Sequence, residues 1–240
     1  MIQVPKTAMV LAAGLGTRMR PLTETTAKPL IEVTSKPLID WAMDALVAAG
    51  VERAVVNVHW YADKVEAHLK QRRDLEIIFS DEREQPLETG GGLAKARPLL
   101  GDDPVYVVNT DAFWFPADPA PLKELAEAYD PSRMDDFLML ADTGRCLGFP
   151  GAGDFFRNEA GQLKRRGEAS SAPWAFAGVR ITRPEFFDGD PVAPFSVMPK
   201  WEAMIENGRL CGWPLDRFWL HVGTPDALAD AEMWLRCHGV

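Results

Sequence analysis

The sequence predicts an α/β fold in which a mixed, mostly parallel sheet is flanked by helices. In the first half, short apolar or β-branched runs alternate with amphipathic stretches, a pattern typical of strand–helix–strand units. In the second half, strand-like runs follow one another with fewer helices between them, which predicts a smaller β-rich lobe. With 240 residues, of which 47% are hydrophobic and 25% charged, the composition is ordinary for a globular protein.

The elements of the first half can be assigned in order. Residues 8–12 form an apolar run that ends in glycines, as buried parallel strands do. Residues 37–49 carry apolar side chains at helical spacing, and Gly50 follows as the expected helix C-cap. The run at 105–108 is the last strand of this half. Further strands are expected at 31–33, 54–58 and 76–79, and helices at 62–71 and 93–99.

The second half closes with the clearest helix signal of the chain. Residues 225–237 have Thr224 as the expected N-cap and Pro225 at the first helical position. Strands are expected at 137–141, 174–181 and 217–222, a hairpin over 154–164 that turns at 158–161, and a helix at 196–207. Because no Ser/Gly-rich linker, repeat or low-complexity tract separates the halves, we expect a single domain over residues 1–240.

Composition and charge exclude several classes of protein. The apolar runs are too short to span a bilayer, and the N-terminus lacks a signal-peptide cleavage site. Three distant cysteines without CxxC spacing predict reduced thiols rather than zinc ligands or disulfides. The net charge of -9 argues against general nucleic-acid binding. We therefore expect a cytoplasmic protein, monomeric or a small homo-oligomer, with no membrane or nucleic-acid partner.

A glycine loop follows the first strand, with the sequence Leu-Ala-Ala-Gly-Leu-Gly-Thr-Arg-Met at residues 11–19. Gly14 and Gly16 let the backbone approach a phosphate closely, with their N–H groups toward its oxygens. Arg18 and Lys28 place two cations beside the loop, as a triphosphate requires. A glycine turn with two surface cations is the structural alternative.

A dinucleotide-binding fingerprint is the competing explanation of this loop. Its third glycine would fall at Met19, which is too large for the close helix–strand packing of that motif. A long loop through Pro21 and Pro29 also replaces the helix that should begin at once. Both departures disfavour a dinucleotide site.

Asp111 follows the strand at 105–108, just as the glycine loop follows the first strand. In parallel sheets, ligands bind beyond the carboxyl ends of the strands, so the two motifs converge on one edge. A carboxylate there can hold Mg²⁺ while phosphate oxygens and water complete its coordination. An aspartate after a strand is also a common turn former or helix cap.

With these motifs the chain resembles the sugar-1-phosphate nucleotidyltransferases, and the resemblance extends along most of its length. The string Leu-Glu-Thr-Gly-Gly-Gly and the compact length are most similar to the branch that uridylylates N-acetylmuramate 1-phosphate in bacterial cell-wall recycling. The matching motifs are residues 11–19 with Lys28 and Pro29, residues 87–92, Asn-Thr-Asp at 109–111, and Trp-Leu-His-Val-Gly-Thr at 219–224.

The resemblance implies a Rossmann-like fold of the nucleotide-diphospho-sugar transferase type. It places the nucleotide-binding half at about 1–115 and the sugar-binding half at about 116–240. The implied nucleotide-binding residues are Leu11, Ala12, Ala13, Gly14, Gly16, Thr17, Thr89, Gly90 and Gly91, with the last three closing over the pyrimidine. The implied catalytic residues are Arg18 and Lys28, on the β- and γ-phosphates, and Asp111, on the metal. Asn109, Asp154 and Gly178 are the candidates for sugar binding.

His221 departs from the family pattern, because relatives carry a second metal-binding aspartate at this position. Magnesium prefers oxygen ligands, whereas imidazole suits softer transition metals. We expect His221 either to bind the metal with Asp111, to hydrogen-bond a phosphate or metal-bound water, or to be a bystander. Asp216 and Asp226 are the alternative carboxylates nearby. The expected cofactor is Mg²⁺, with Mn²⁺ as the alternative.

The family implies transfer of a nucleotidyl group from a nucleoside triphosphate to a sugar 1-phosphate, with release of pyrophosphate. UTP and N-acetylmuramate 1-phosphate are the substrates that the resemblance favours. Glucose and mannose relatives usually carry a Glu-Lys-Pro string before the long substrate strand, and residues 163–168 offer no clean match. Three alternatives stay open: transfer to mannose, glucose, heptose or choline phosphate; a non-catalytic nucleotide-sugar sensor, motivated by His221; and a nicotinamide oxidoreductase, disfavoured by Met19.

Overall fold

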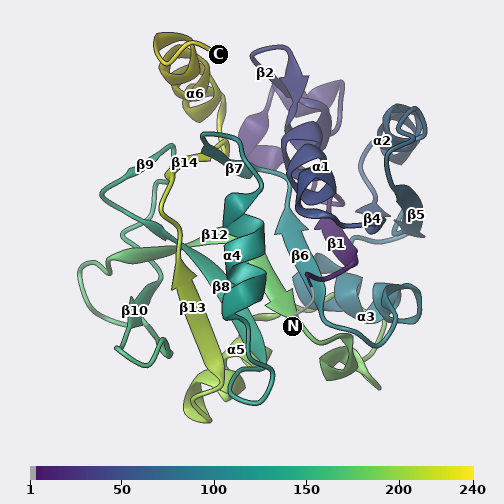
Figure 1. Cartoon of the computed structure of the whole chain (residues 1–240). Coiled ribbons are helices and arrows are strands. Elements are labelled where there is room, and N and C mark those ends of the chain that lie inside the picture. Colours follow the sequence, from purple (N-terminus) through teal and green to yellow (C-terminus); the bar gives the residue numbers. More distant parts are fainter. Residues whose placement is uncertain (1–3) are drawn as a thin grey trace.

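A nine-stranded sheet forms the centre of the molecule, and the computed structural model describes residues 4–240. Its strands are β1 (Thr7–Leu11), β4 (Arg53–Val58), β5 (Glu76–Asp81), β6 (Val105–Asn109), β8 (Asp136–Asp142), β10 (Phe155–Arg157), β11 (Leu163–Arg165), β12 (Trp174–Thr182) and β13 (Leu210–Pro214). Four parallel strands of the first half lie in the order β6-β1-β4-β5 (Figure 1). Antiparallel β12 lies beside β6 and also pairs with β8, which is parallel to β13; the β10–β11 hairpin adjoins β12.

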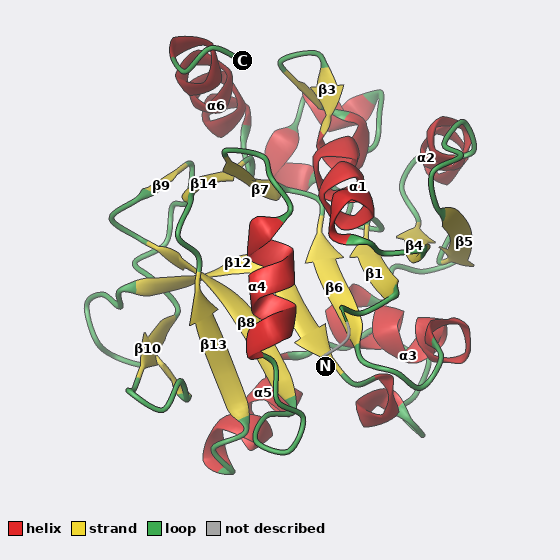
Figure 2. Cartoon of the chain, in the orientation of Figure 1, coloured by secondary structure: helices red, strands yellow, loops and turns green. Residues whose placement is uncertain are grey.

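Helices cover both faces of this sheet. They are α1 (Leu38–Ala49), α2 (Ala62–Leu69), α3 (Glu88–Leu100), α4 (Ala120–Ala128), α5 (Met198–Glu206) and α6 (Pro225–Cys237). Ala8 and Val10 of β1 share a buried cluster with α1, α2 and α4, whereas Met9 points to the other face and packs with α3 and α5. Figure 2 shows α1 and α4 in front of the sheet. Within the described part of the chain, no helix has the length and apolar character needed to cross a membrane.

A small second sheet lies beside the main one, with strands β7 (Ala112–Phe115), β14 (Phe218–His221) and β9 (Cys146–Leu147) in that order. The aromatic rings of Phe218 and Trp234 stack with centroids 4.3 Å apart, which attaches α6 to β14. A hairpin of two short strands, β2 (Glu32–Val33) and β3 (Lys36–Pro37), precedes α1. Short 3₁₀ helices lie at Thr17–Met19, Leu22–Glu24, Lys28–Leu30 and Pro184–Phe187.

The predicted mixed sheet flanked by helices is confirmed, with its parallel strands concentrated in the first half. Gly50 adopts the left-handed conformation after α1, and the Thr224 side chain accepts a hydrogen bond from Ala227 N–H at the start of α6, as predicted. One boundary was wrong: the helix expected at 93–99 begins at Glu88 and contains the three glycines. Strands β7 and β13 and helix α4 were not predicted.

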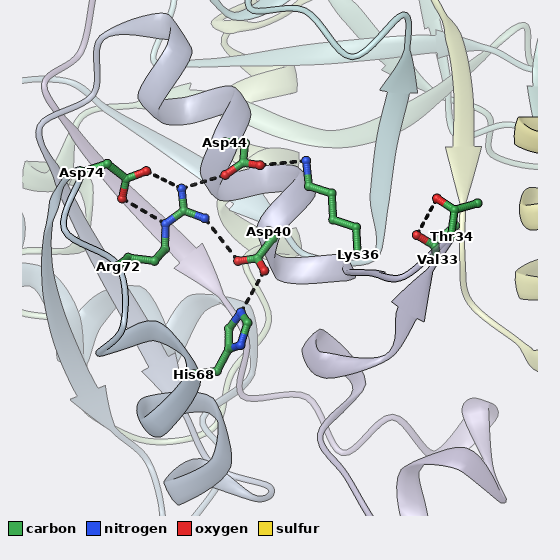
Figure 3. Close-up of polar contacts among 8 residues, drawn as sticks. All are labelled: Val33, Thr34, Lys36, Asp40, Asp44, His68, Arg72 and Asp74. Carbon is green, nitrogen blue, oxygen red and sulfur yellow. Dashed lines mark hydrogen bonds and ion pairs between the residues drawn. The ribbon is translucent and has the colours of Figure 1, made fainter. Parts of the chain in front are cut away.

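An ion-pair cluster joins α1 to the connection between α2 and β5 (Figure 3). The guanidinium of Arg72 donates to the carboxylates of Asp40, Asp44 and Asp74. His68 of α2 lies 2.8 Å from Asp40 through its Nε2 atom. These contacts fix the connection on the outer surface of α1, and none of the five residues lines the cleft described below.

Candidate functional site

A cleft of about 690 Å³ opens at the carboxyl ends of β1, β4 and β6, beside the N-terminus of α3. This is the edge of a parallel sheet at which ligands bind. Predicted site residues that line it are Leu11, Ala12, Ala13, Gly14, Gly16, Thr17, Arg18, Lys28, Thr89, Asn109 and Asp111. Lining residues that the sequence did not predict include Asn57, Glu82, Pro86, Glu88 and Ser196.

Gly16 lets the glycine loop fold back on itself. Its φ is +62°, and a Cβ atom there would lie 2.8 Å from Cγ2 of Thr23 and 3.0 Å from Cβ of Lys28. The Thr23 hydroxyl donates to the Gly16 carbonyl at 2.8 Å, and the Trp60 indole donates to the Thr23 carbonyl at 2.9 Å. By contrast, a Cβ atom on Gly14 would meet nothing within 4 Å, so the loop is open at that point. The close approach at Gly16 brings Lys28 to the cleft.

Lys28 and Asp111 form an ion pair within the cleft. Lys28 Nζ donates to Asp111 Oδ2 at 2.7 Å, and the two side chains are 13% and 23% exposed. Burial raises the pKa of the Asp111 carboxyl, but His221 and the Lys28 ammonium outweigh burial and hold that pKa well below its usual range. Asp111 is therefore a carboxylate at neutral pH.

His221 lies beside Asp111 because β14 pairs with β7, where His221 is opposite Ala112. Its Nε2 atom is 3.7 Å from Asp111 Oδ2, and its Nδ1 atom is 3.2 Å from the Gly148 carbonyl. A carbonyl only accepts hydrogen bonds, so Nδ1 donates to Gly148, and Nε2 is the nitrogen that faces Asp111. A Cβ atom on Gly223 would lie 2.6 Å from the ring, so Gly223 leaves room for it to face Asp111.

The donor set of Asp111 and His221 fits a divalent metal that is completed by its substrate. A carbonyl on the far nitrogen of an imidazole is the usual support of a ligating histidine. Among residues 4–240 no cluster of three or more His, Cys, Asp or Glu side chains is placed to hold a metal, so the other ligands would be phosphate oxygens and water. Asp216 instead pairs with Arg145, 3.1 Å away.

The first turn of α3 is bound by the segment 193–197, called here the strap. The N–H groups of Gly90 and Gly91 donate to the Phe195 carbonyl at 2.9 and 3.2 Å, and Val197 N–H donates to the Thr89 hydroxyl at 3.0 Å. A Cβ atom on Gly91 would lie 2.1 Å from the Ala193 carbonyl oxygen. The glycines thus admit the strap, and Gly90 and Gly91 lie outside the cleft lining. Their contact with a pyrimidine stays a prediction.

The three candidates for sugar binding occupy different surroundings. Asn109 lines the cleft. Gly178 lies next to Asn109, at an irregularity in the pairing of β12 with β8. Its φ is +85°, and a Cβ atom there would be 3.3 Å from Cβ of Asn109. Asp154 is not among the lining residues; its Oδ2 accepts the N–H of Phe176 at 2.9 Å and holds β12 in place. The binding roles of all three stay predictions.

Asn57 and Glu82 are two buried polar residues of the cleft that were not predicted from the sequence, 3% and 1% exposed. Asn57 lies near the end of β4, paired in register with Leu11, and Glu82 follows β5. The rule that located Asp111, a polar side chain at the carboxyl end of a parallel strand, applies to both.

Known proteins resemble this chain in sequence along most of its length. A family model described as nucleotidyl transferase matches residues 7–138. The chain is 49% identical to N-acetylmuramate alpha-1-phosphate uridylyltransferase of Caulobacter vibrioides, over 97% of this chain and 98% of that protein. It is 34% identical to the protein of the same name from Neisseria meningitidis serogroup B, over 94% and 96%.

Solved structures share the fold at low identity. HddC from Yersinia pseudotuberculosis superposes with a TM-score of 0.76 at 19% identity, over 95% of this chain and 99% of that one. The inositol-1-phosphate CTP transferase from T. maritima superposes with a TM-score of 0.79 at 16% identity, over 100% and 98%. From the family match and the two homologues, the chain belongs to the nucleotidyl transferase family of enzymes.

Proposed function

We propose that this enzyme transfers the uridylyl group of UTP to N-acetylmuramate 1-phosphate, forming the UDP-sugar and pyrophosphate. The observation that carries the proposal is the Lys28–Asp111 pair, placed beside an open glycine loop at the edge of a parallel sheet. The choice of UTP and of the muramate ester rests on the 49% identical Caulobacter vibrioides protein, which aligns along nearly its whole length.

The reaction requires no protein nucleophile. A phosphate oxygen of the sugar 1-phosphate forms a bond to the α-phosphorus of UTP, and the bond from that phosphorus to the bridging oxygen breaks. The electron pair leaves with pyrophosphate. Lys28 and Arg18 stabilise the charge that accumulates on the departing group, because both cations line the cleft that receives the triphosphate. The backbone of the glycine loop orients the triphosphate.

Asp111 and His221 would hold the divalent metal, with Mg²⁺ as the expected ion and Mn²⁺ as the alternative. A bound metal would neutralise phosphate charge and polarise the phosphoryl oxygens. Lys28 donates to Asp111 in the structure, so a triphosphate that draws Lys28 toward its own oxygens frees a lone pair of the carboxylate.

The two halves of the chain divide the substrates in this proposal. Residues 1–115 bind the nucleotide and residues 116–240 the sugar, in a single cytoplasmic domain with only small-molecule partners. Asn109 lies where the two would meet, since it lines the cleft and a Cβ atom on Gly178 of the second half would lie 3.3 Å from its Cβ. The strap is an exception to the division, because its Ser196 lines the nucleotide side.

The direct test is pyrophosphate release by the purified protein with each nucleoside triphosphate and a panel of sugar 1-phosphates, in Mg²⁺ and in Mn²⁺. Release with UTP and N-acetylmuramate 1-phosphate alone is the expected result. Release only with another sugar would keep the chemistry and reject the muramate substrate. Binding of UTP with no turnover across the panel would reject the enzyme proposal and favour a sensor.

A further inference from the structure

A buried hydrogen-bonded pair connects the two walls of the nucleotide cleft. Asn57 Oδ1 accepts the N–H of Ala12 at 2.7 Å, and Asn57 Nδ2 donates to Glu82 Oε1 at 2.8 Å. Glu82 Oε2 accepts the N–H of Leu87 at 2.9 Å. Ala12 begins the glycine loop, and Leu87 directly precedes α3. One chain of three hydrogen bonds therefore joins loop to helix.

The polarity of this chain is determined at every atom. Both ends are backbone N–H groups, which only donate, so each end must meet an acceptor. An amide supplies one acceptor and one donor, and a carboxylate supplies two acceptors; Asn57 and Glu82 together satisfy all contacts. A buried group left without its partner is costly, so the pair resists any change in the spacing of Ala12 and Leu87.

Packing around the pair leaves little space. A Cβ atom on Gly92, one turn into α3, would lie 3.0 Å from Glu82 Oε1 and 3.1 Å from Asn57 Nδ2. The helix thus approaches the pair closely, while Ala12 and Thr89 line the cleft. The separation of the two walls is set by these contacts together.

We propose that Asn57 and Glu82 are positioning residues that set the distance between the glycine loop and the N-terminus of α3, and thereby the fit of the nucleoside part of the substrate. The inference rests on the proposed function, since it concerns the same cleft. The triphosphate end is held by Arg18 and Lys28, which have no bond to the pair among the described residues. Nucleoside affinity and phosphate affinity should therefore separate.

The experiment uses variants that change hydrogen-bond polarity without changing size. Glu82→Gln replaces one acceptor by an NH₂ donor, so a donor then faces either Asn57 Nδ2 or the Leu87 N–H. Asn57→Asp places a second carboxylate opposite that of Glu82, so two acceptors face each other. In the double variant Asn57→Asp/Glu82→Gln, the carboxylate at position 57 accepts from Ala12 N–H and from the amide at position 82, whose oxygen accepts from Leu87 N–H. All three hydrogen bonds return, with the middle one reversed.

The measurement is calorimetric binding of UTP and of inorganic tripolyphosphate, each without a sugar acceptor. We expect each single variant to bind UTP about tenfold more weakly, the equivalent of one lost buried hydrogen bond, and to bind tripolyphosphate as the parent does. The double variant should recover UTP affinity to within about threefold. Gly92→Ala, which adds only a methyl group against the pair, should weaken UTP binding in the same direction, even if a single variant fails to fold. Asn207→Asp, at an exposed amide far along the chain, is the control for added charge.

Three results would overturn the inference. Unchanged UTP affinity in the folded variants would show that the pair sets nothing in the cleft. Parallel losses for UTP and tripolyphosphate, or a double variant no better than the singles, would indicate general destabilisation. The proposed function fails separately, through the parent protein: if it binds UTP but releases no pyrophosphate with any sugar 1-phosphate, the enzyme proposal falls and the positioning role still stands.

Discussion

Asp111 lies between the Lys28 ammonium and the His221 imidazole, and the two make different contacts with its carboxylate. Lys28 Nζ bonds Oδ2 directly at 2.7 Å, while His221 Nε2 lies 3.7 Å from the same oxygen, too far for a hydrogen bond. The separation of Nε2 and Oδ2 leaves room for a metal cation that binds both atoms as ligands. Until a metal binds, Lys28 neutralises the charge of the Asp111 carboxylate.

Asp111→Asn removes the negative charge while it keeps the shape of the side chain. Because the proposed metal ligand and the partner of Lys28 are lost together, we expect kcat to fall roughly 10²–10³-fold, the scale of one lost electrostatic contact in a transition state. UTP affinity measured without metal should change little. A variant with parental turnover would remove Asp111 from the reaction.

His221→Asp tests the choice of metal. An aspartate would offer oxygen in place of nitrogen, so we expect Mg²⁺ to support turnover better, relative to Mn²⁺, than in the parent. Pulsed electron paramagnetic resonance of bound Mn²⁺ gives an independent readout, because a ligating imidazole nitrogen modulates the spin echo. That modulation should be present in the parent and absent from the variant. Its absence from the parent would show that His221 does not bind the metal.

Among the secondary-structure elements, α3 owes its beginning to tertiary contacts. Three consecutive glycines have poor helix propensity, which is why the sequence predicted a helix that begins only at residue 93. The strap supplies an acceptor for two of the free N–H groups in the first turn, and the glycines let it approach. Helix formation there depends on residues that lie far along the chain.

Gly91→Ala should uncouple this packing. Its methyl group would lie 2.1 Å from the Ala193 carbonyl, so the strap must move, and we expect a loss of about 1–3 kcal/mol in the free energy of unfolding. Denaturant titration measures it. Gly144→Ala, whose Cβ would meet only Asp142 Oδ1 at 3.3 Å, is the matched control and should cost much less. Equal stabilities would mean that the strap adapts freely.

The same distinction explains which elements the sequence revealed. The buried parallel strands and the caps at Gly50 and Thr224 follow from local chemistry, and the structure has them where predicted. Strand β13 contains Gly212 and Pro214, residues with low strand preference, and it forms because it lies against β8. Strand β7 begins directly after Asp111, and no turn residue there indicates that a new strand starts.

The site divides in a similar way. Residues of the glycine loop and Asp111 were identifiable because each lies where a strand ends, and the cleft brings them together. The proximity of His221 to Asp111 depends on the register of β14 with β7, which no local pattern specifies. The pairing of Asn57 with Glu82 depends on the order of β4 and β5 in the sheet, which becomes visible only when the strands are placed.

For the molecule as a whole, paired carboxylates govern stability in acid. Burial raises the pKa of Asp44, but hydrogen bonds from Lys36 and Arg72 outweigh it and leave that pKa below its usual range, as is also the case for Asp111. Such groups bind fewer protons in the folded state than in the unfolded chain, so their contribution is present above about pH 4 and is lost below it. Asp136, whose pKa burial raises, acts in the opposite sense.

We therefore expect the melting temperature to be nearly constant from pH 7 to about pH 5 and to fall as the pH drops below about 4. Thermal melts across this range measure it. High salt should reduce the difference, since it screens the exposed pairs of the α1 cluster more than the pair in the cleft (Figure 3). A protein that became more stable on acidification would contradict this account.

The long reach of the strap also bears on how the chain is synthesised. Domains assemble from the N-terminus as the ribosome releases the chain. The glycine loop, Asp111 and the first turn of α3 emerge early, yet the Phe195 carbonyl that holds that turn emerges late. Until β12 arrives, β6 is an open edge that can pair with the wrong strand. A nascent or truncated chain that ends before the strap thus carries the phosphate loop without a finished cleft, and competence for nucleotide arrives only as translation nears its end.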